Sequence, residues 1–473
     1  MYLYYKTFSR WQTFRNDTIN ITFYQSSKIN NSIYSDVINR YQMPFVNAYW
    51  FFFSIAVTVT FSQVDKVTYE GAQVWQTTLR GAEDVLLIKR LVDNQDISIW
   101  NLRPTRADFL VRAQHKVKVY RQMTARNLSH TVLIMDVQRR IDTQPVANTL
   151  WTENTLRIGH RLSWKKYPTL NIIEEYYNFL AEDYSSICRV QSIGTTAENR
   201  TIKMINITNG NPNNQIILIT GGQHAREWAS VTSALYVLHN IITKFDKQKS
   251  YVRNKNWLII PVVNPDGYVY SHTVDRLWRK NRRKFMYCVG VDVNRNFATD
   301  WGIAGITENN ECKTTYSGPY PFSEAESVAL RDLIKSLVPK PIAIVDFHSY
   351  GKLILFPWSA RPQATPNLQL HRQTADLMTN SMYKSTKQNY TLGATYHTVY
   401  PATGTFLDWA YSTGVAHTYV IESRDKGELG FLLPPEEIED TGKELYAAVR
   451  ALAKTIKCSE EASQNKSDNE TWF

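Results

Sequence analysis

The chain has 473 residues, of which 43% are hydrophobic and 21% are charged, enough to bury one large core and a smaller second domain. Its formal net charge is +11, yet no run of lysine and arginine is interleaved with aromatic residues, which argues against a nucleic-acid partner. There is no repeat and no low-complexity stretch, so we expect ordinary globular domains.

The first apolar segment, residues 48–61 (AYWFFFSIAVTVTF), has the length of a signal-peptide core and is too short to span a membrane comfortably. Met43 would place this run where a signal peptide belongs. We therefore expect residues 43–63 to be a signal peptide of a secreted, extracellular protein and residues 1–42 to be an upstream extension of the reading frame. A signal anchor is the alternative.

Residues 64–144 predict a small domain of their own. The patterns change about every ten to fifteen residues and predict the element order β-α-β-β-α-β, which is that of a ferredoxin-like α+β sandwich. We assign this domain no chemistry. Residues 145–161 follow with little periodicity, and they contain Arg157 and Arg161. A basic, weakly structured connector is where a trypsin-like protease cuts, and an ordinary interdomain linker is the alternative.

Residues 162–457 alternate between strand and helix patterns. Several of the strands are apolar throughout, which predicts an α/β domain with a mixed, mostly parallel sheet flanked by helices on both faces. The final helix is expected to end at Ile456, before a polar tail at residues 458–473. Ligands of such sheets bind at the carboxyl ends of the strands.

Two of these strand ends carry metal-ligating residue types. The stretch LITGGQHAREWA (Leu218–Ala229) delivers His224 and Glu227, three residues apart, to the start of a helix. A second apolar strand ends on His348. A His, Glu, His set suits a catalytic zinc ion and leaves one coordination position for water. The alternative is that the first two residues serve the helix terminus and His348 is a core histidine.

Further charged residues lie at other strand ends. Glu422 ends the apolar strand YVIES and is a candidate general base, unless it pairs with Arg424. After VGVDV, Asn294 and Arg295 place an amide and a guanidinium where they can fork onto a carboxylate. Asp292, on that strand, can orient a ligating imidazole. By default, the basic run RLWRKNRR is interpreted as a solvated face.

The four cysteines contain no C-x-x-C pair, which argues against a thiolate zinc site. Cys288 and Cys312 flank one loop and are the best candidates for a disulfide, in keeping with secretion. Cys188 and Cys458 have no obvious partner; they either pair with each other or remain thiols.

Seven motifs occur in order over about 300 residues: HAREW, PVVNPDGY, RLWRKNR, CVGVDVNRNF, FHSY, TVYPATGTFLDWAY and IESRDKGELGFLLP. Together they resemble the zinc metallocarboxypeptidases of the pancreatic digestive A/B type. The upstream domain is similar to the inhibitory propeptide of that family.

The resemblance implies one Zn²⁺ ion per chain, bound by His224, Glu227 and His348. It implies a zinc-activated water with Glu422 as general base, and Arg279 as the cation that stabilises the oxyanion. The remaining substrate contacts that it implies are Asn294 and Arg295 at the terminal carboxylate, Arg226 and Tyr350 further along the substrate, Tyr400 closing over the terminal residue, and Phe431 packing nearby.

Specificity should depend on the pocket for the terminal side chain. Basic-specific members of the family place an acidic residue at its floor, where this chain has Leu407. The other expected lining residues are Thr395, Val399, Ala402 and Val420. A buried lysine or arginine head would find no counter-charge there, so we expect preference for aliphatic or aromatic C-terminal residues.

The sequence thus predicts a monomeric, secreted proenzyme, activated by a trypsin-like protease, that acts on the C-termini of peptides or proteins. A zinc-dependent deacylase of small molecules is an alternative, although it would not need Asn294, Arg295 and Tyr400. A non-catalytic binding module is another, although it could lose Glu422 and Arg279 freely.

Overall fold

The computed structural model of the chain describes residues 65–144, 146–147, 162–303 and 308–470. The expected upstream extension (1–42), the expected signal peptide (43–63) and Arg157 and Arg161 of the expected linker lie outside these residues. No helix of the described part is both long and apolar enough to cross a membrane.

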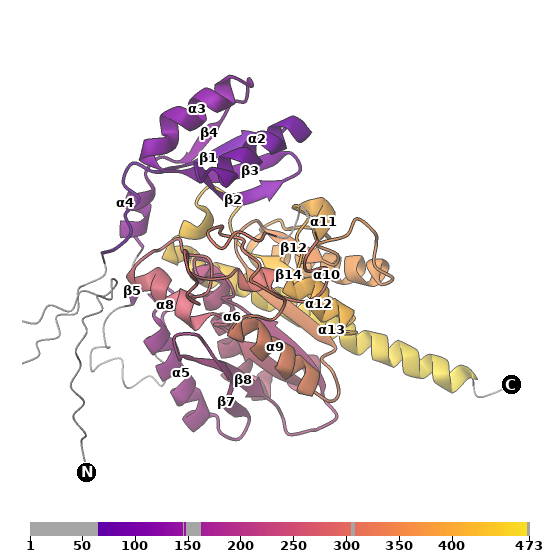
Figure 1. Ribbon diagram of the computed structural model, residues 1–473. Coiled ribbons are helices and arrows are strands. Elements are labelled where there is room, and N and C mark those ends of the chain that lie inside the picture. The colour runs from indigo at the N-terminus through magenta and orange to yellow at the C-terminus, as the bar shows by residue number, and fades with distance from the viewer. Residues whose placement is uncertain (1–64, 145, 148–161, 304–307, 471–473) are drawn as a thin grey trace, which may run out of the picture. The chain divides into compact units, whose positions relative to one another are not determined.

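The small domain has the expected ferredoxin-like order of elements (Figure 1). Its four-stranded sheet has the order β2-β3-β1-β4, and neighbouring strands are antiparallel. Its core contains buried Trp75, Phe109 and Leu91. The elements are β1 (Gln73–Thr78), α2 (Ala82–Asp93), β2 (Ile97–Arg103), β3 (Arg106–Val111), η1 (Ala113–His115), α3 (Lys116–Thr124), β4 (Thr131–Ile134) and α4 (Val137–Asp142).

The large domain is built on a mixed eight-stranded sheet of order β13-β12-β14-β11-β9-β10-β8-β7. The central strands β14, β11, β9 and β10 run parallel to their neighbours in that series, and β8 and β7 join antiparallel. The strands are β7 (Cys188–Thr195), β8 (Thr201–Ile207), β9 (Gln215–Thr220), β10 (Lys255–Ile260), β11 (Ala343–His348), β12 (Leu353–Phe356), β13 (Thr391–Ala394) and β14 (His417–Glu422).

Helices cover both faces of this sheet, as expected (Figure 1). One core packs α5, α6, α10 and α13 against the strands, and a second core packs α9 and α12 against the opposite face. The helices are α5 (Leu170–Asp183), α6 (Trp228–Ile242), α7 (Ser250–Arg253), α8 (Pro265–Thr273), α9 (Ala325–Ser336), α10 (Leu368–Thr386), α11 (Thr395–Thr398), α12 (Phe406–Ser412) and α13 (Ile438–Glu470). Short 3-10 turns are η3 (Phe245–Lys247), η4 (Val293–Arg295), η5 (Gly430–Leu432) and η6 (Pro435–Glu437), and a two-residue ladder pairs β5 (Val146–Ala147) with β6 (Tyr167–Pro168).

Strand β4 ends at Ile134, because the carboxylate of Asp136 accepts a hydrogen bond from the Arg139 amide at 2.9 Å and so starts a new helix. One element end differs from the expectation. The final helix was expected to end at Ile456 but continues to Glu470, since no proline or glycine interrupts that stretch.

The small domain packs directly on the large one. Trp100 and Val137 share a buried cluster with Leu277, Tyr350 and Phe431 of the large domain. The contact places strand β2 over the carboxyl ends of the central strands, where the candidate site residues lie.

The expected disulfide between Cys288 and Cys312 is present, and Cys188 is a buried free thiol.

Candidate metal centre and substrate pocket

A glycine turn after β9 delivers the first two candidate ligands. Gly222 has φ +65°, and a Cβ atom there would lie 2.8 Å from a methyl group of Val231, so glycine is required. His224 follows in this turn. Glu227 is the N-cap residue of α6, but its side chain makes no capping bond and turns towards the histidines instead. The alternative that Glu227 serves only the helix terminus is therefore wrong.

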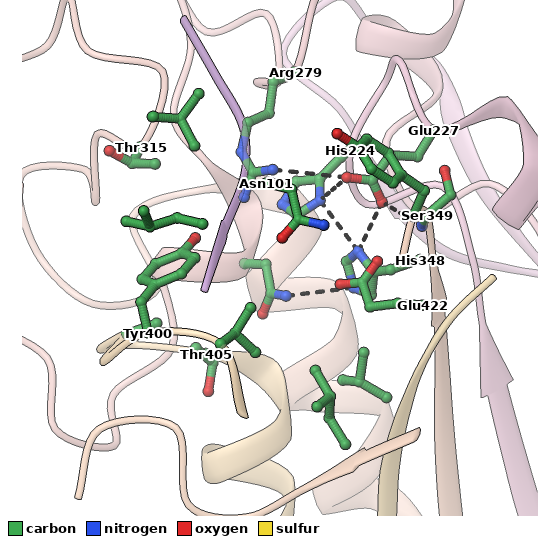
Figure 2. A pocket seen from close by; sticks show the side chains of 18 of the residues that line it. Asn101, His224, Glu227, Arg279, Thr315, His348, Ser349, Tyr400, Thr405 and Glu422 are labelled. Carbon is green, nitrogen blue, oxygen red and sulfur yellow. Dashed lines mark hydrogen bonds and ion pairs between the residues drawn. The ribbon is translucent and has the colours of Figure 1, made fainter. Parts of the chain in front are cut away.

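His224, Glu227 and His348 converge on one point (Figure 2). One ligand atom from each lies within 4.8 Å of the others. The two Nδ1 atoms are 3.1 Å apart, and they lie 2.8 Å and 2.9 Å from the two carboxylate oxygens of Glu227. Two ligands arranged tetrahedrally at about 2.0 Å from zinc are separated by roughly 3.3 Å. The donor types and their spacing therefore fit a zinc ion.

Two buried aspartates hold the far sides of these imidazoles. Asp292 lies 2.9 Å from Nε2 of His224, and Asp346 lies 2.7 Å from Nε2 of His348. Each carboxylate accepts the proton of Nε2, which leaves Nδ1 as the lone-pair donor for a metal. Of these two aspartates, only Asp292 was expected from the sequence as an orienting residue. The signal for Asp346 was present, because residues two apart on a strand point to the same side, and Asp346 precedes His348 by two.

Electrostatics favour the charged forms of these carboxylates. Burial works to raise the pKa of Glu227, but its electrostatic interactions and hydrogen bonds with His224 and His348 outweigh burial and lower that pKa. Burial likewise works to raise the pKa of Asp292, and Arg279 and His224 lower it well below the usual range. Both groups are thus anionic, as cation binding requires.

Glu422 and Arg279 line the same pocket as the metal set. Burial, with some repulsion from Glu227, raises the pKa of Glu422 to about 8. Arg424 does not pair with Glu422, because its Nε donates to Glu444 at 3.0 Å. Arg279 donates to Asp292 at 2.9 Å, so the same carboxylate holds this arginine and His224.

The basic run containing Arg279 is not a solvated face. Arg276 is buried and lies 3.6 Å from the centre of the Trp228 ring. Arg283 pairs with Glu324 at 3.0 Å. The run therefore belongs to the domain interior and to the pocket wall.

A second cationic group lies beside the metal set. The side-chain oxygen of Asn294 accepts from the Phe406 amide at 2.8 Å, and its Nδ2 lies 3.4 Å from Nε2 of His348. Arg295 donates to the hydroxyl of Tyr400 at 2.7 Å. Asn294, Arg295 and Tyr400 all line the pocket, so an amide, a guanidinium and a phenol are available there to bind a carboxylate.

The adjoining part of the pocket is apolar. Leu407 and Val420 form a buried cluster with Leu353 and Leu355, against which Val399 packs. Asp408 follows Leu407 in sequence, yet its carboxylate is occupied by three hydrogen bonds from the backbone amides of residues 359 and 360. It is not among the described residues that line the pocket, whose only acids are Glu227 and Glu422.

The remaining sequence-predicted residues lie in the same pocket, namely Arg226, Tyr350, Phe431, Thr395 and Ala402. Burial lowers the pKa of Arg226 to about 10, and its guanidinium lies 4.1 Å from the centre of the Phe431 ring. Four residues of the small domain, 99–102, line the pocket as well. Sequence reasoning gave no sign of them, because their position depends on how two domains pack.

Comparisons with known proteins agree with this geometry. Residues 173–448 match the zinc carboxypeptidase family, and residues 75–144 match the carboxypeptidase activation peptide. The chain is 30% identical to mast cell carboxypeptidase A of Rattus norvegicus over 405 residues, covering 82% of this chain and 96% of the relative. It is also 30% identical to carboxypeptidase B of Rattus norvegicus over 413 residues, covering 85% and 97%.

Solved structures give the same result. The crystal structure of thrombin activatable fibrinolysis inhibitor matches with a TM-score of 0.74 and 27% identity, covering 82% of this chain and 99% of that one. Carboxypeptidase A from Helicoverpa armigera matches with a TM-score of 0.73 and 25% identity, covering 82% and 99%. The chain is a zinc-dependent enzyme of the carboxypeptidase family and carries that family's activation peptide.

Proposed function

We propose that this protein is a secreted precursor of a carboxypeptidase that removes single aliphatic or aromatic residues from the C-termini of peptides. The observation that carries this proposal is the apolar pocket around Leu407, next to a carboxylate-binding group and a zinc-type donor set. The relatives do not decide the preference, since an A-type and a B-type carboxypeptidase are equally similar.

His224, Glu227 and His348 would hold the zinc ion, and Asp292 and Asp346 would orient the histidines. When bound, zinc supplies a Lewis acid that acidifies water and polarises a carbonyl group. Glu422 would take the proton of the attacking water and pass it to the leaving amine.

Two arginines would bind two different negatively charged groups of the substrate. Arg279 lies 3.7 Å from Glu227 and faces the pocket, where it would stabilise the oxygen that becomes negative in the transition state. Arg295, with Asn294 and Tyr400, would hold the terminal carboxylate. A site that binds a free carboxylate beside the reacting bond cuts only the last peptide bond. A small-molecule deacylase would not need such a carboxylate-binding group.

The small domain would keep the precursor inactive, because residues 99–102 lie in the pocket where a peptide would bind. A trypsin-like protease would release it by cutting within residues 145–161. The active enzyme is proposed to be a monomer that acts outside the cell.

The test is the hydrolysis of two blocked dipeptides, one ending in phenylalanine and one in arginine, by trypsin-treated protein with and without a zinc chelator. We expect chelator-sensitive cleavage of the phenylalanine substrate alone. Comparable cleavage of the arginine substrate would refute the specificity, and cleavage of neither would refute the peptidase activity. Equal activity before and after trypsin would refute the latency.

A further inference from the structure

Strand β2 of the small domain contains a bulge where it crosses the pocket. In the ladder with β3, Ile99 pairs with Phe109 and Asn101 pairs with Asp108, so Trp100 is an extra residue. Trp100 and Asn101 are consequently both buried, instead of alternating between the two faces. Bulges of this kind re-aim a side chain, often next to an active site.

The bulge is fixed to the large domain on both sides of Asn101. The ring of Trp100 lies 5.0 Å from the ring of Phe431. Arg103 donates a hydrogen bond to the carbonyl of Gly351 at 2.9 Å. The backbone at Asn101 therefore has little freedom to withdraw its side chain from the pocket.

The side chain of Asn101 points into the pocket among His224, Arg279 and His348 (Figure 2). It is 8% exposed, and its Nδ2 atom is buried without a hydrogen-bond partner in the described part of the chain. An unpaired buried donor costs about 1–3 kcal/mol, so a polar side chain in this position requires an explanation.

We propose that Asn101 is a metal ligand of the precursor, and that its side-chain oxygen takes the fourth coordination position of the zinc ion. A half-turn of the amide exchanges Oδ1 and Nδ2, which offers the oxygen to the metal. The precursor site then has four protein ligands, as closed structural zinc sites do, and water is excluded from the position that the reaction needs.

This inference rests on the zinc site of the proposed function and adds a separate claim about latency. Steric cover by the small domain would hinder large substrates but leave the metal its water. Ligation by Asn101 removes that water, so it also suppresses the cleavage of the smallest substrates, and it slows the loss of zinc from the precursor.

The experiment compares uncut precursors that contain Co²⁺ in place of zinc, because the visible absorption of cobalt reports its ligands. The variants are Asn101→Leu, which removes the donor with little change of size, and Asn101→Asp, which restores an oxygen. We expect the leucine precursor to show the spectrum of the trypsin-treated enzyme, and the aspartate precursor to differ from it as the wild-type precursor does. The leucine precursor should also release zinc to a chelator about 10-fold faster than wild type.

Trypsin treatment supplies the matched control. Once the small domain is removed, all three proteins contain the same catalytic domain, so their spectra and zinc-release rates must coincide. Hydrogen exchange of the β2 amides in the precursors checks that the small domain remains docked in the leucine variant.

Identical cobalt spectra for the wild-type and leucine precursors would overturn the proposal. An aspartate precursor with the spectrum of the trypsin-treated enzyme would also overturn it, because the spectral change would then come from dissociation of the small domain and not from the loss of a ligand. Cut wild-type protein that binds cobalt but cleaves no peptide would refute the proposed peptidase function while leaving the ligand assignment intact.

Discussion

His348 and Glu422 are register partners at the ends of two adjacent parallel strands, β11 and β14. A candidate metal ligand and the candidate base are thus fixed to one another through the ladder of the central sheet. Their separation does not depend on a loop, which favours a rigid site in which proton transfer needs little rearrangement.

We expect Glu422→Gln to lower kcat about 10²–10⁴-fold, because glutamine keeps the shape but cannot take a proton. Zinc content, measured by elemental analysis, should stay at that of the wild-type enzyme. A variant that loses its zinc together with its activity would show that Glu422 supports the metal site instead of acting as the base.

Asp346→Asn should lower the zinc affinity about 10–100-fold, since the carboxylate that orients His348 is replaced by a neutral amide. Competition with a chromogenic chelator measures the affinity. Asp408→Asn is the matched control, because Asp408 is equally buried but binds the backbone amides of residues 359 and 360. Equal losses in the two variants would contradict a specific role for Asp346.

Leu407→Asp should raise the ratio of kcat/KM for arginine-terminated over phenylalanine-terminated substrates by at least about 100-fold, because it pairs a buried guanidinium. Leu407→Asn removes the leucine without adding a charge, and it should lower phenylalanine cleavage without the gain on arginine. If Leu407→Asn showed the same gain, the pocket would select by size or polarity and not by charge.

Arg295→Ala should reduce the preference for peptides with a free C-terminal carboxylate over the corresponding amides on the order of 100-fold, because a buried charge loses its partner. The comparison uses kcat/KM for one peptide in both forms. Arg361→Ala serves as the control, since Arg361 forms an exposed pair with Asp300. If Arg295→Ala kept the preference for the free carboxylate over the amide, the terminal carboxylate of the substrate would bind at another group.

Stability should depend on pH through Glu326. Burial raises the pKa of this carboxyl from 4.5 to about 7, and among the described residues its Oε1 has no hydrogen-bond partner. The folded state therefore holds the proton more tightly than the unfolded state. Its contribution to stability is complete below about pH 4.5 and is lost as the pH rises through about 7.

The free energy of unfolding should accordingly fall by about 2–3 kcal/mol between pH 5 and pH 8 through this one group. Glu326→Gln should remove that part of the fall, as measured by urea denaturation at both pH values. An unchanged pH dependence in the variant would assign the titration to another group.

The sequence was informative where chemistry coincides with a strand end. His224, Glu227, His348 and Glu422 follow apolar runs, and the strands of such sheets end at one edge. The apolar strands and amphipathic helices also predicted the layers of both domains. These features are local, so periodicity and residue type were sufficient.

The parts that escaped prediction depend on contacts between distant segments. Asn101 reaches the pocket because a bulge is held by the packing of Trp100, and no periodic pattern encodes a bulge. Strand β12 (Leu353–Phe356) is four residues long, too short for a pattern to identify. The pairing of Arg424 with Glu444 likewise joins segments that only the fold brings together.

Asp292 binds both His224 and Arg279, so one carboxylate supports the metal and the cation proposed to stabilise the transition state. Substitutions of Asp292 therefore cannot change zinc binding and the position of Arg279 independently. A substitution of Asp292 that weakens zinc binding also displaces Arg279. In double mutants of Asp292 with His224 or Arg279, the free-energy changes of the single mutants should be strongly non-additive. Changes of catalytic power among descendants of this enzyme should therefore arise in the pocket walls, while this triad remains fixed.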